Sequence, residues 1–401
     1  MITLNDIKQA KEKLEGVSQK TPFTLATILS KELNSQIYVK KENLQLTGSF
    51  KIRGAFNKLS QLTQIQRDKG VVAASAGNHA QGLAYSAQHF ECDATIFMPE
   101  ATPLTKVSGV KSYGAQVILK GANYDESYAH ATAFAKEYEK EFIHPFADDA
   151  VIAGQGTIAL EILAECQDLD MIIVPIGGGG LISGIAIAAK AINPNIKIIG
   201  VQASGANAMK TSFEMQIVSN SKSVKTIADG IAVRDATPMM LDYILEYVDE
   251  IVEVEEQEIA NAILFLLERQ KLVVEGAGAV TVAAMMHKKI DVEDKKVATI
   301  ISGGNIDVTM LSLIIEKGLV KSNRKMKLLV TLMDKPGALM HITSILKDSD
   351  ANIVQIDYDR NSVKLDFGEA HVTIALETKG KEHQNTIREN LKHNGYRFKQ
   401  I

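Results

Sequence analysis

The sequence predicts an α/β protein with mainly parallel sheets, followed by a smaller unit whose elements come in a different order. From about residue 35 to 320, short β-branched or apolar runs alternate with amphipathic stretches of helix length, which is typical of repeated βα units. Beyond this region the expected order is β-α-β-β-α-β, a ferredoxin-like arrangement. Because 401 residues exceed the size that one hydrophobic core supports, we expect at least two domains.

The strands predicted for the first part are mostly bounded by Gly, Pro, Asn or Ser, which commonly end secondary structure. Amphipathic segments between the strands should form helices that cover the sheet faces, joined by right-handed crossovers. The strands are Gln36–Lys40, Gly70–Ala74, Asp93–Met98, Gln116–Leu119, Met171–Ile176, Lys197–Gln202 and Val297–Ile301, and the helices are His79–His89, Asn123–Lys140, Gln155–Cys166 and Leu181–Ala191.

A polar and basic stretch at 321–325 is predicted to link a first domain, 1–320, to a second domain, 326–401. In the second domain Leu339, Ile342 and Leu346 recur at helical spacing, which gives one helix an apolar face for a small sheet. The elements expected there are a strand at Met326–Met333, a turn at Asp334–Gly337, a helix at Ala338–Ser349, strands near Ala351–Asp359 and Glu369–Glu377, a helix at Lys381–His393 and a strand at Tyr396–Ile401.

The composition, with 46% hydrophobic and 23% charged residues, is that of an ordinary globular protein. A net charge of −4 provides no broad cationic surface, so we expect neither nucleic acid nor membrane as a partner. Cys92 and Cys166 are far apart and no ligand spacing is present, which indicates a reducing compartment and no metal site. The N-terminal segment does not resemble a signal peptide, so we expect a cytoplasmic protein acting on small molecules.

Lys51 stands between two apolar neighbours, Phe50 and Ile52, just after a glycine and a hydroxyl residue. Burial disfavours the charged form of a lysine, lowers its pKa and makes the amine available as a nucleophile toward carbonyl compounds. The alternative is a surface lysine with its ammonium in water, which is the usual situation. This segment alone does not decide between the two.

Four consecutive glycines, Gly177–Gly180, follow the predicted strand Met171–Ile176 and precede a helical stretch. Glycines allow backbone N–H groups to approach an anion, and the following helix contributes its positive end, so the loop is predicted to bind a phosphate. A flexible turn is the alternative. The loop lacks a GK[ST] ending and fits no GxGxxG register, and the next strand ends in Gln202 rather than an acid. A compact monophosphate is therefore favoured over a nucleotide.

Two further strands end in small polar residues. The first leads into Ser75-Ala76-Gly77-Asn78-His79, and the second leads into Ser302-Gly303-Gly304-Asn305. Taken alone, helix capping explains the first cluster and an ordinary turn explains the second. Because the carboxyl ends of parallel strands share one edge of a sheet, however, we expect both clusters and the glycine loop to meet at a ligand crevice.

Together, the segments Ser49–Ala55 and Ser75–His79, the tetraglycine and Ser302–Asn305 resemble the threonine and serine dehydratase group of fold-type II pyridoxal-phosphate enzymes. The resemblance covers about the first 320 residues. It implies a two-part catalytic unit, with a smaller subdomain of about 48–150 inserted in the larger one. It also implies roles for single residues: Lys51 forms the imine with the cofactor, Phe50 flanks its ring, Asn78 hydrogen-bonds its ring oxygen, Gly177, Gly178, Gly179, Gly180 and Leu181 hold its phosphate, and Ser302 meets its pyridine nitrogen.

Within this group, Ile52-Arg53-Gly54 and Asp229–Val233 are similar to segments of threonine dehydratases. The resemblance implies dehydration and deamination of threonine to 2-oxobutanoate and ammonia, with Lys51 as the base for the α-proton. Ser75, Gly77, Asn78 and His79 are then candidates for binding the substrate carboxylate. Serine racemases share nearly all of these motifs, so serine dehydratase or racemase activity is an alternative. A non-catalytic amino-acid sensor is a third possibility, which the retained Lys51 disfavours.

The second domain resembles an ACT domain, a type of unit that commonly pairs with another copy and binds amino acids between the two. The resemblance rests on Asp334–Leu339 and on Asn352-Ile353, and it implies an effector site at Gly337, Ala338, Leu339, Asn352 and Ile353. One such unit per chain is typical of the medium-length threonine ammonia-lyases. We therefore expect a homodimer or homotetramer that an amino acid such as isoleucine or valine regulates.

Overall fold

The computed structural model describes residues 1–361 and 365–401, which form two compact units, 1–307 and 308–401. The units meet after Asp307, earlier than the predicted boundary at residue 320. The reason is that α14 (Val308–Lys321) belongs to the second unit, where it contacts β11 (Lys325–Met333). Of the predicted linker 321–325, Lys321 ends α14 and Lys325 begins β11. No described helix is long and apolar enough to cross a membrane.

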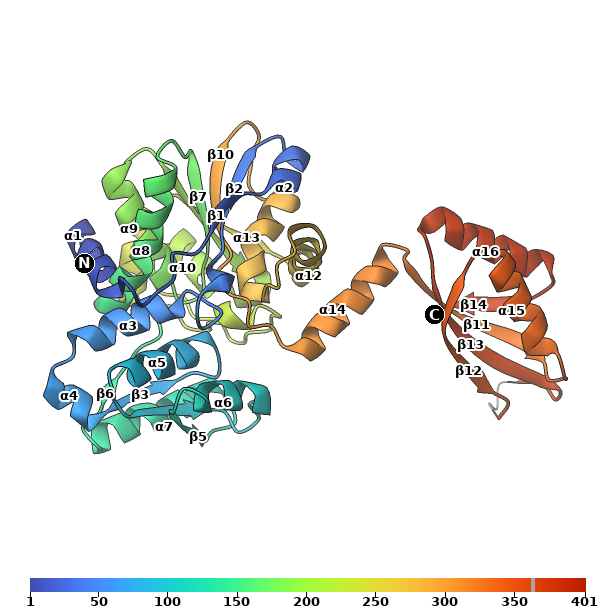
Figure 1. Ribbon diagram of the computed structural model, residues 1–401, viewed down its shortest axis with the longest axis horizontal. Coiled ribbons are helices and arrows are strands. Elements are labelled where there is room, and N and C mark those ends of the chain that lie inside the picture. The colour runs from blue at the N-terminus through green and yellow to red at the C-terminus, as the bar shows by residue number, and fades with distance from the viewer. Residues whose placement is uncertain (362–364) are drawn as a thin grey trace. The chain divides into compact units, whose positions relative to one another are not determined.

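The first unit contains a larger sheet with the strand order β1-β2-β10-β7-β8-β9, parallel except for β1. One face packs on α8 (Asp149–Glu165), α9 (Gly180–Ile192) and α11 (Pro238–Tyr247). α13 (Gly276–Met286) contacts β7, β8, β9 and β10. Figure 1 shows α8 and α9 to one side of these strands and α13 to the other. The strands are β1 (Phe23–Leu25), β2 (Gln36–Lys40), β7 (Met171–Pro175), β8 (Lys197–Ala203), β9 (Glu250–Val254) and β10 (Lys296–Ile300).

A smaller, wholly parallel sheet of the first unit has the order β5-β4-β3-β6. Alternate residues of β3 enter two separate cores, one shared with α5 and α6 and the other with α7, so helices cover both faces. α3 contacts both α5 and α8 and so connects the two sheets. The elements are β3 (Val71–Ala74), β4 (Ala94–Met98), β5 (Gln116–Leu119), β6 (Glu141–Phe142), α3 (Lys51–Gln61), α4 (Gln64–Lys69), α5 (Asn78–His89), α6 (Leu104–Lys111) and α7 (Tyr124–Glu137).

The remaining helices of the first unit lie at its N-terminus and after β8. α12 continues directly into a π-helical turn, η4. These elements are α1 (Leu4–Leu14), α2 (Thr27–Glu32), η1 (Glu42–Leu44), η2 (Ser204–Ala206), α10 (Ala208–Met215), η3 (Asp229–Ile231), α12 (Glu256–Phe265) and η4 (Leu266–Gln270). The α/β class with mainly parallel sheets is thus confirmed, and each strand predicted in this part is present.

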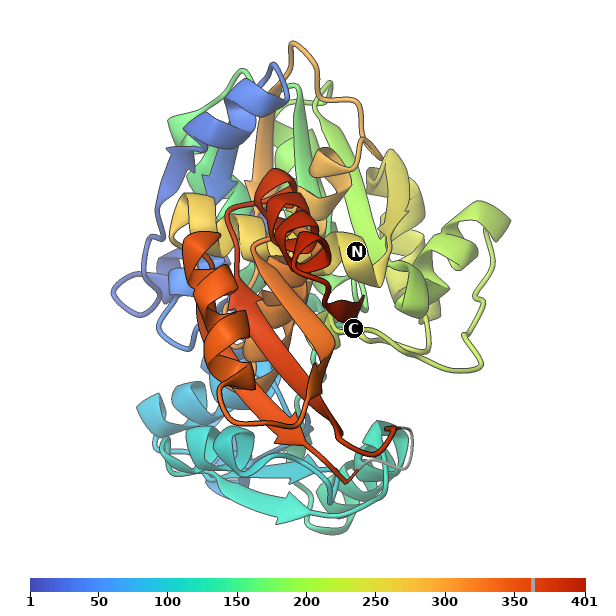
Figure 2. The ribbon, with the colours of Figure 1, turned by 90° about the vertical axis from the view of Figure 1, so that its right-hand side faces the viewer.

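The second unit has the predicted β-α-β-β-α-β order after α14, in an antiparallel sheet with the strand order β12-β13-β11-β14. Both of its later helices pack on one face of this sheet (Figure 2). Ile342 and Leu346 are buried as predicted, whereas Leu339 is 36% exposed and lies outside the core. The elements are α15 (Ala338–Asp348), β12 (Asn352–Asp359), β13 (Glu369–Glu377), α16 (Lys381–His393) and β14 (Arg397–Gln400).

Candidate active site

A cavity of about 720 Å³ opens where the two sheets of the first unit face each other. The carboxyl ends of β3, β7 and β10 supply its polar clusters, and α3, α5 and α9 begin at its wall. The structure therefore brings together the segments that the sequence predicted to share one crevice. Every residue predicted to bind cofactor or substrate lines it: Phe50, Lys51, Ser75, Gly77, Asn78, His79, Gly177, Gly178, Gly179, Gly180, Leu181 and Ser302.

Lys51 is the first residue of α3 and faces this cavity rather than open solvent. Its Nζ donates a hydrogen bond to the carbonyl oxygen of Pro145 at 3.0 Å and lies 5.2 Å from the centre of the Phe50 ring. Burial lowers the pKa of Lys51 to about 8, an effect that the carboxylate of Glu275 partly opposes. A useful fraction of the amine is therefore neutral and nucleophilic near neutral pH.

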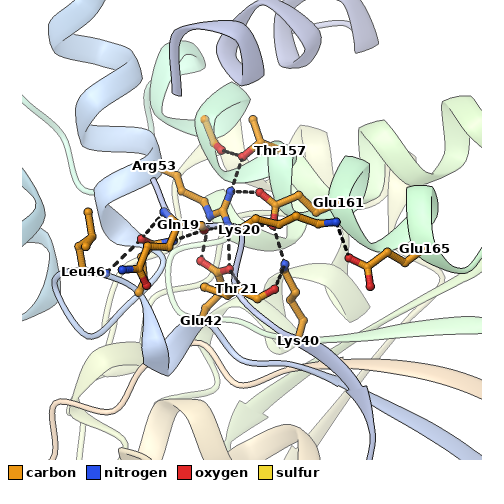
Figure 3. A network of polar contacts seen from close by, with 12 residues as sticks. Gln19, Lys20, Thr21, Lys40, Glu42, Leu46, Arg53, Thr157, Glu161 and Glu165 are labelled. Atoms are coloured by element: carbon orange, nitrogen blue, oxygen red, sulfur yellow. Dashed lines mark hydrogen bonds and ion pairs between the residues drawn. The ribbon is translucent and has the colours of Figure 1, made fainter. Parts of the chain in front are cut away.

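A buried ionic cluster fixes the helix that carries Lys51. Figure 3 shows Arg53, two residues further along α3, between the carboxylates of Glu42 and Glu161. Arg53 Nε lies 2.9 Å from Glu42 and Nη1 lies 2.6 Å from Glu161, and Lys40 Nζ lies 2.5 Å from Glu161. Two positive and two negative groups thus neutralise one another where α3, η1, β2 and α8 meet. Arg53 does not line the cavity. Its ion pairs hold α3 in place behind the cavity wall.

The glycine loop is tightly packed, so the flexible-turn alternative does not describe it. Gly179 has a φ of +100° and forms the N-cap of α9, a conformation that favours glycine. A Cβ at Gly178 would lie 2.4 Å from the ring of Phe146. Among the residues that the structure describes, the N–H groups of Gly177, Gly178 and Gly179 have no acceptor. They are available to bind an anion at the positive end of α9.

The polar cluster after β3 does not cap its helix, which excludes the simpler alternative. The N-cap of α5 is Gly77, and the structure shows no side-chain capping bond there. Instead, Asn78 Nδ2 donates to Glu275 Oε1 at 2.7 Å, and Ser75 Oγ accepts from Gly77 N at 3.2 Å. His79 is buried and its Nε2 donates to the carbonyl oxygen of Ile143 at 3.0 Å. Burial lowers the pKa of His79 to about 3, so this imidazole is neutral.

Two residues of the site, Glu275 and Asn305, had no role assigned from the sequence. Glu275 is 3% exposed, lines the cavity and is held near Asn78. Burial and then the charge of Asp229 raise the pKa of Glu275 to about 7. Asn305 Nδ2 donates to Asn78 Oδ1 at 2.7 Å. The only sequence signal was the position of Asn305 in the cluster after β10, since no local pattern marks Glu275.

The chemistry of the cavity fits a phosphate-bearing aldehyde. A lysine of lowered pKa, free loop N–H groups and the Ser302 hydroxyl all face one space. Two buried polar atoms of its lining, His79 Nδ1 and Gln155 Oε1, have no hydrogen-bond partner among the residues described, as expected where a polar ligand belongs. No group of three or more His, Cys, Asp or Glu side chains within residues 1–361 and 365–401 is placed to hold a metal ion.

The two parts of the predicted effector site do not meet within one copy of the second unit. Gly337, with a φ of +86°, precedes Ala338 and Leu339 at the start of α15. Asn352 and Ile353 begin β12, after the end of α15. An 11-residue helix separates the two groups by roughly 16 Å along its axis.

The two-sheet fold and the lysine-containing cavity define a fold-type II pyridoxal-phosphate enzyme, and residues 14–303 match the pyridoxal-phosphate dependent enzyme family. The chain belongs to this family, and pyridoxal phosphate is its cofactor.

Within the family the chain is similar to threonine-converting members over nearly its whole length. It is 48% identical to an L-threonine ammonia-lyase of Thermotoga maritima, over 99% of this chain and 98% of that protein. An L-threonine ammonia-lyase of Geobacter sulfurreducens is 44% identical over the same shares. Among solved structures, threonine deaminase isoform 2 of Solanum lycopersicum matches with a TM-score of 0.75 and 38% identity, over 78% of this chain and 86% of that one. Maize serine racemase matches with a TM-score of 0.74 and 34% identity, over 80% and 99%.

Proposed function

We propose that this enzyme is a threonine ammonia-lyase that converts L-threonine to 2-oxobutanoate and ammonia and also acts on L-serine. The observation that carries the proposal is Lys51, a lysine of lowered pKa in one cavity with the glycine loop and Ser302. The relatives that match almost the whole chain bear this activity in their names. Water is lost from threonine and regained, so the net change is the release of ammonia.

Lys51 has the central part in this reaction. Bound pyridoxal phosphate supplies an electron sink for negative charge at the α-carbon of the substrate. Lys51 would hold the cofactor covalently until the amino group of the substrate takes its place, and the neutral amine released in this exchange would then take the α-proton. Once protonated, Nζ can deliver a proton to the departing β-hydroxyl. A pKa of about 8 suits both tasks, because the neutral and the charged form are each well populated near neutral pH.

The other cavity residues bind and orient. The N–H groups of Gly177–Leu181 would hold the cofactor phosphate, Phe50 would flank the ring and the Asn78 side chain would donate to the ring oxygen. Ser302 would offer a hydroxyl to the pyridine nitrogen, and a neutral partner does not enforce protonation there, which would favour prompt loss of the β-substituent. Ser75 and the N–H groups of Gly77 and Asn78 would bind the substrate carboxylate. His79 is neutral and contributes shape rather than charge.

Serine dehydration or racemisation is the second candidate, because maize serine racemase matches 80% of this chain. Comparison of threonine with serine turnover, together with a search for D-serine, separates the two. Higher kcat/KM for threonine and no D-serine are the results that we expect.

The decisive measurement is the visible spectrum of the purified protein, followed by a keto-acid assay with threonine. We expect an absorbing cofactor and formation of 2-oxobutanoate. Lys51→Ala should abolish both, whereas Lys58→Ala, a change on the same helix but outside the cavity, should leave the spectrum in place. A colourless protein that stays inactive after addition of pyridoxal phosphate would overturn the proposal.

Regulation and assembly are part of the same proposal. Since the predicted effector residues lie at opposite ends of α15, the first group of one copy can meet the second group only in another copy. A homodimer or homotetramer in which second units pair would form such sites, and isoleucine or valine is the proposed effector class. The cytoplasm is the proposed location, in keeping with the absence of any membrane-spanning helix among the described residues.

A further inference from the structure

The side-chain amide of Asn78 is held from both sides. Its Nδ2 donates to Glu275 Oε1 at 2.7 Å, and its Oδ1 accepts from Asn305 Nδ2 at 2.7 Å. Asn305 Nδ2 also donates to the carbonyl oxygen of Thr47 at 2.8 Å. Of these residues Thr47 precedes α3, Asn78 begins α5, Glu275 precedes α13 and Asn305 follows β10. The hydrogen-bonded chain joins these four segments at the cavity wall.

The direction of the hydrogen bonds in this chain is fixed from its Thr47 end. The carbonyl oxygen of Thr47 can only accept, so Asn305 must turn its Nδ2 toward it. The second N–H of that amide then requires an acceptor, which is Asn78 Oδ1. A carboxylate at the other end, Glu275, accepts from Asn78 Nδ2. A flipped Asn78 amide would break both bonds and place two oxygen atoms together.

The local structure shows that the Glu275 side chain is used for the hydrogen bond with Asn78 and not for helix capping. It occupies the N-cap position of α13, where a carboxylate normally accepts helix N–H groups, yet its side chain makes no capping bond. A Cβ at Gly303 would lie 2.3 Å from Glu275 Oε1, and a Cβ at Gly48 would lie 2.4 Å from Asn305 Oδ1. Glycine backbone therefore leaves the room that both side chains need.

We propose that Glu275 and Asn305 are positioning residues, which clamp the Asn78 amide so that it presents a donor and never an acceptor to the cofactor. Asn78 Nδ2 has a second N–H, and the structure records no acceptor for it among the residues it describes. Asn78 lines the cavity, so this N–H is the group available to the anionic ring oxygen. The inference deepens the function proposed above and rests on the role given there to Asn78.

Two substitutions reverse or remove the clamp. Asn305→Asp replaces the donor with an acceptor of the same size, so Asn78 should turn its Nδ2 toward residue 305 and its oxygen toward the cofactor. Glu275→Leu removes the acceptor at the other end, whereas Glu275→Gln keeps an acceptor oxygen without the charge. Asn57→Asp is the control for an amide-to-carboxylate change, since Asn57 is buried, donates to the carbonyl oxygen of Ala150 and does not line the cavity.

The readouts are the absorption spectrum of the bound cofactor and the dissociation constant of the cofactor. The constant is measured by titrating pyridoxal phosphate into full-length enzyme from which the cofactor has been removed. For Asn305→Asp and Glu275→Leu we expect the long-wavelength band to fall, a shorter-wavelength band to rise and cofactor binding to weaken about tenfold, the equivalent of one charge-assisted hydrogen bond. Glu275→Gln and Asn57→Asp should keep the parental band. Thermal unfolding identifies any variant that fails to fold, and Glu275→Leu then serves in place of Asn305→Asp.

The proposal is contradicted if Asn305→Asp and Glu275→Leu both keep the parental spectrum and cofactor affinity. It is also contradicted if Glu275→Gln shifts the spectrum as much as Glu275→Leu, because the charge of residue 275 rather than the orientation of Asn78 would then matter. Threonine turnover by the parent enzyme is measured on the same preparations. A parent enzyme that binds the cofactor but does not convert threonine contradicts the proposed function alone, since the spectral comparison is independent of turnover.

Discussion

At the scale of single residues, the site depends on two ionisable groups that burial shifts in opposite ways. Burial lowers the pKa of Lys51 to about 8 and raises that of Glu275 to about 7. The neutral form of each group is therefore available under the same conditions. A neutral amine is the form that attacks a carbonyl group, and a weakly charged carboxyl leaves that amine less stabilised as a cation.

The pH dependence of cofactor uptake tests the state of Lys51. Attack on the cofactor aldehyde needs the uncharged amine, and a lysine is uncharged above its pKa, so the rate should rise with pH. For the enzyme stripped of cofactor, we expect half of the maximal rate of spectral recovery near pH 8 and a plateau above it. Lys51→Ala should recover nothing. A rate that still climbs toward pH 10.5, the pKa of an ordinary lysine, would contradict this environment.

The cavity residues that lie in short motifs could be predicted from the sequence, whereas Glu275, which lies in none, could not. Lys51, Asn78 and Ser302 each stand beside glycines or hydroxyl residues at a strand end or helix start, where parallel sheets hold ligands. Glu275 follows two valines and contacts Asn78 across 197 positions of sequence. A contact of that range depends on tertiary packing, and no local pattern encodes it.

At the scale of elements, strands buried on both faces were the easiest to predict. β4 and β7 are wholly buried, and their continuous apolar runs predict buried strands. β9 could not be recognised because it lies at the sheet edge and two glutamates, Glu250 and Glu253, interrupt its apolar residues. β6 has two residues and β1 has three, too few to show a period. The helices were easier to predict than these short strands, because the amphipathic spacing of a helix extends over more residues.

The packing of the glycine loop against Phe146 leads to a prediction on cofactor binding. Gly178→Ala places a methyl group 2.4 Å from the Phe146 ring, so either the loop or the ring must move. We expect cofactor affinity to fall about tenfold, within the range that overpacking produces. In the double variant Gly178→Ala/Phe146→Leu the smaller, flexible side chain should restore much of the loss. A penalty for Gly178→Ala that is the same with Phe146 and with Leu at that position would show that the contact is irrelevant.

The ionic cluster behind α3 leads to a prediction on stability. Arg53→Met removes the guanidinium that pairs with the buried carboxylate of Glu42 and leaves Glu161 with Lys40 alone, a loss of about 3–5 kcal/mol. We expect the midpoint of thermal unfolding to fall by roughly 10 °C at fixed cofactor concentration. Lys20→Met is the matched control, because the Lys20–Glu165 pair at 2.9 Å is exposed and water screens its charges. Equal shifts in the two variants would contradict the importance of burial.

At the scale of the whole molecule, the chain joins a catalytic unit to a second unit of different architecture through a helix that belongs to the second. The sequence marked the change of order correctly but placed the boundary too late, because the apolar residues of α14 continue the pattern of the first unit. In the proposed enzyme, an effector site built from parts of two copies would couple regulation and assembly to catalysis.

An effector titration of the full chain tests this coupling. We expect isoleucine or valine to bind by calorimetry, to shift the threonine saturation curve and to change the oligomer distribution in analytical ultracentrifugation. Gly337→Val should abolish the response while leaving kcat without effector in place, because a β-branched residue cannot readily adopt a φ of +86° at the start of α15. Gly395→Val, at a φ of +77° before β14, carries the same backbone penalty outside the predicted effector loop and is the matched control. Unchanged kinetics and no heat of binding across a panel of amino acids would rule out regulation by this route, and an equal loss in the control would trace the effect to misfolding of the second unit.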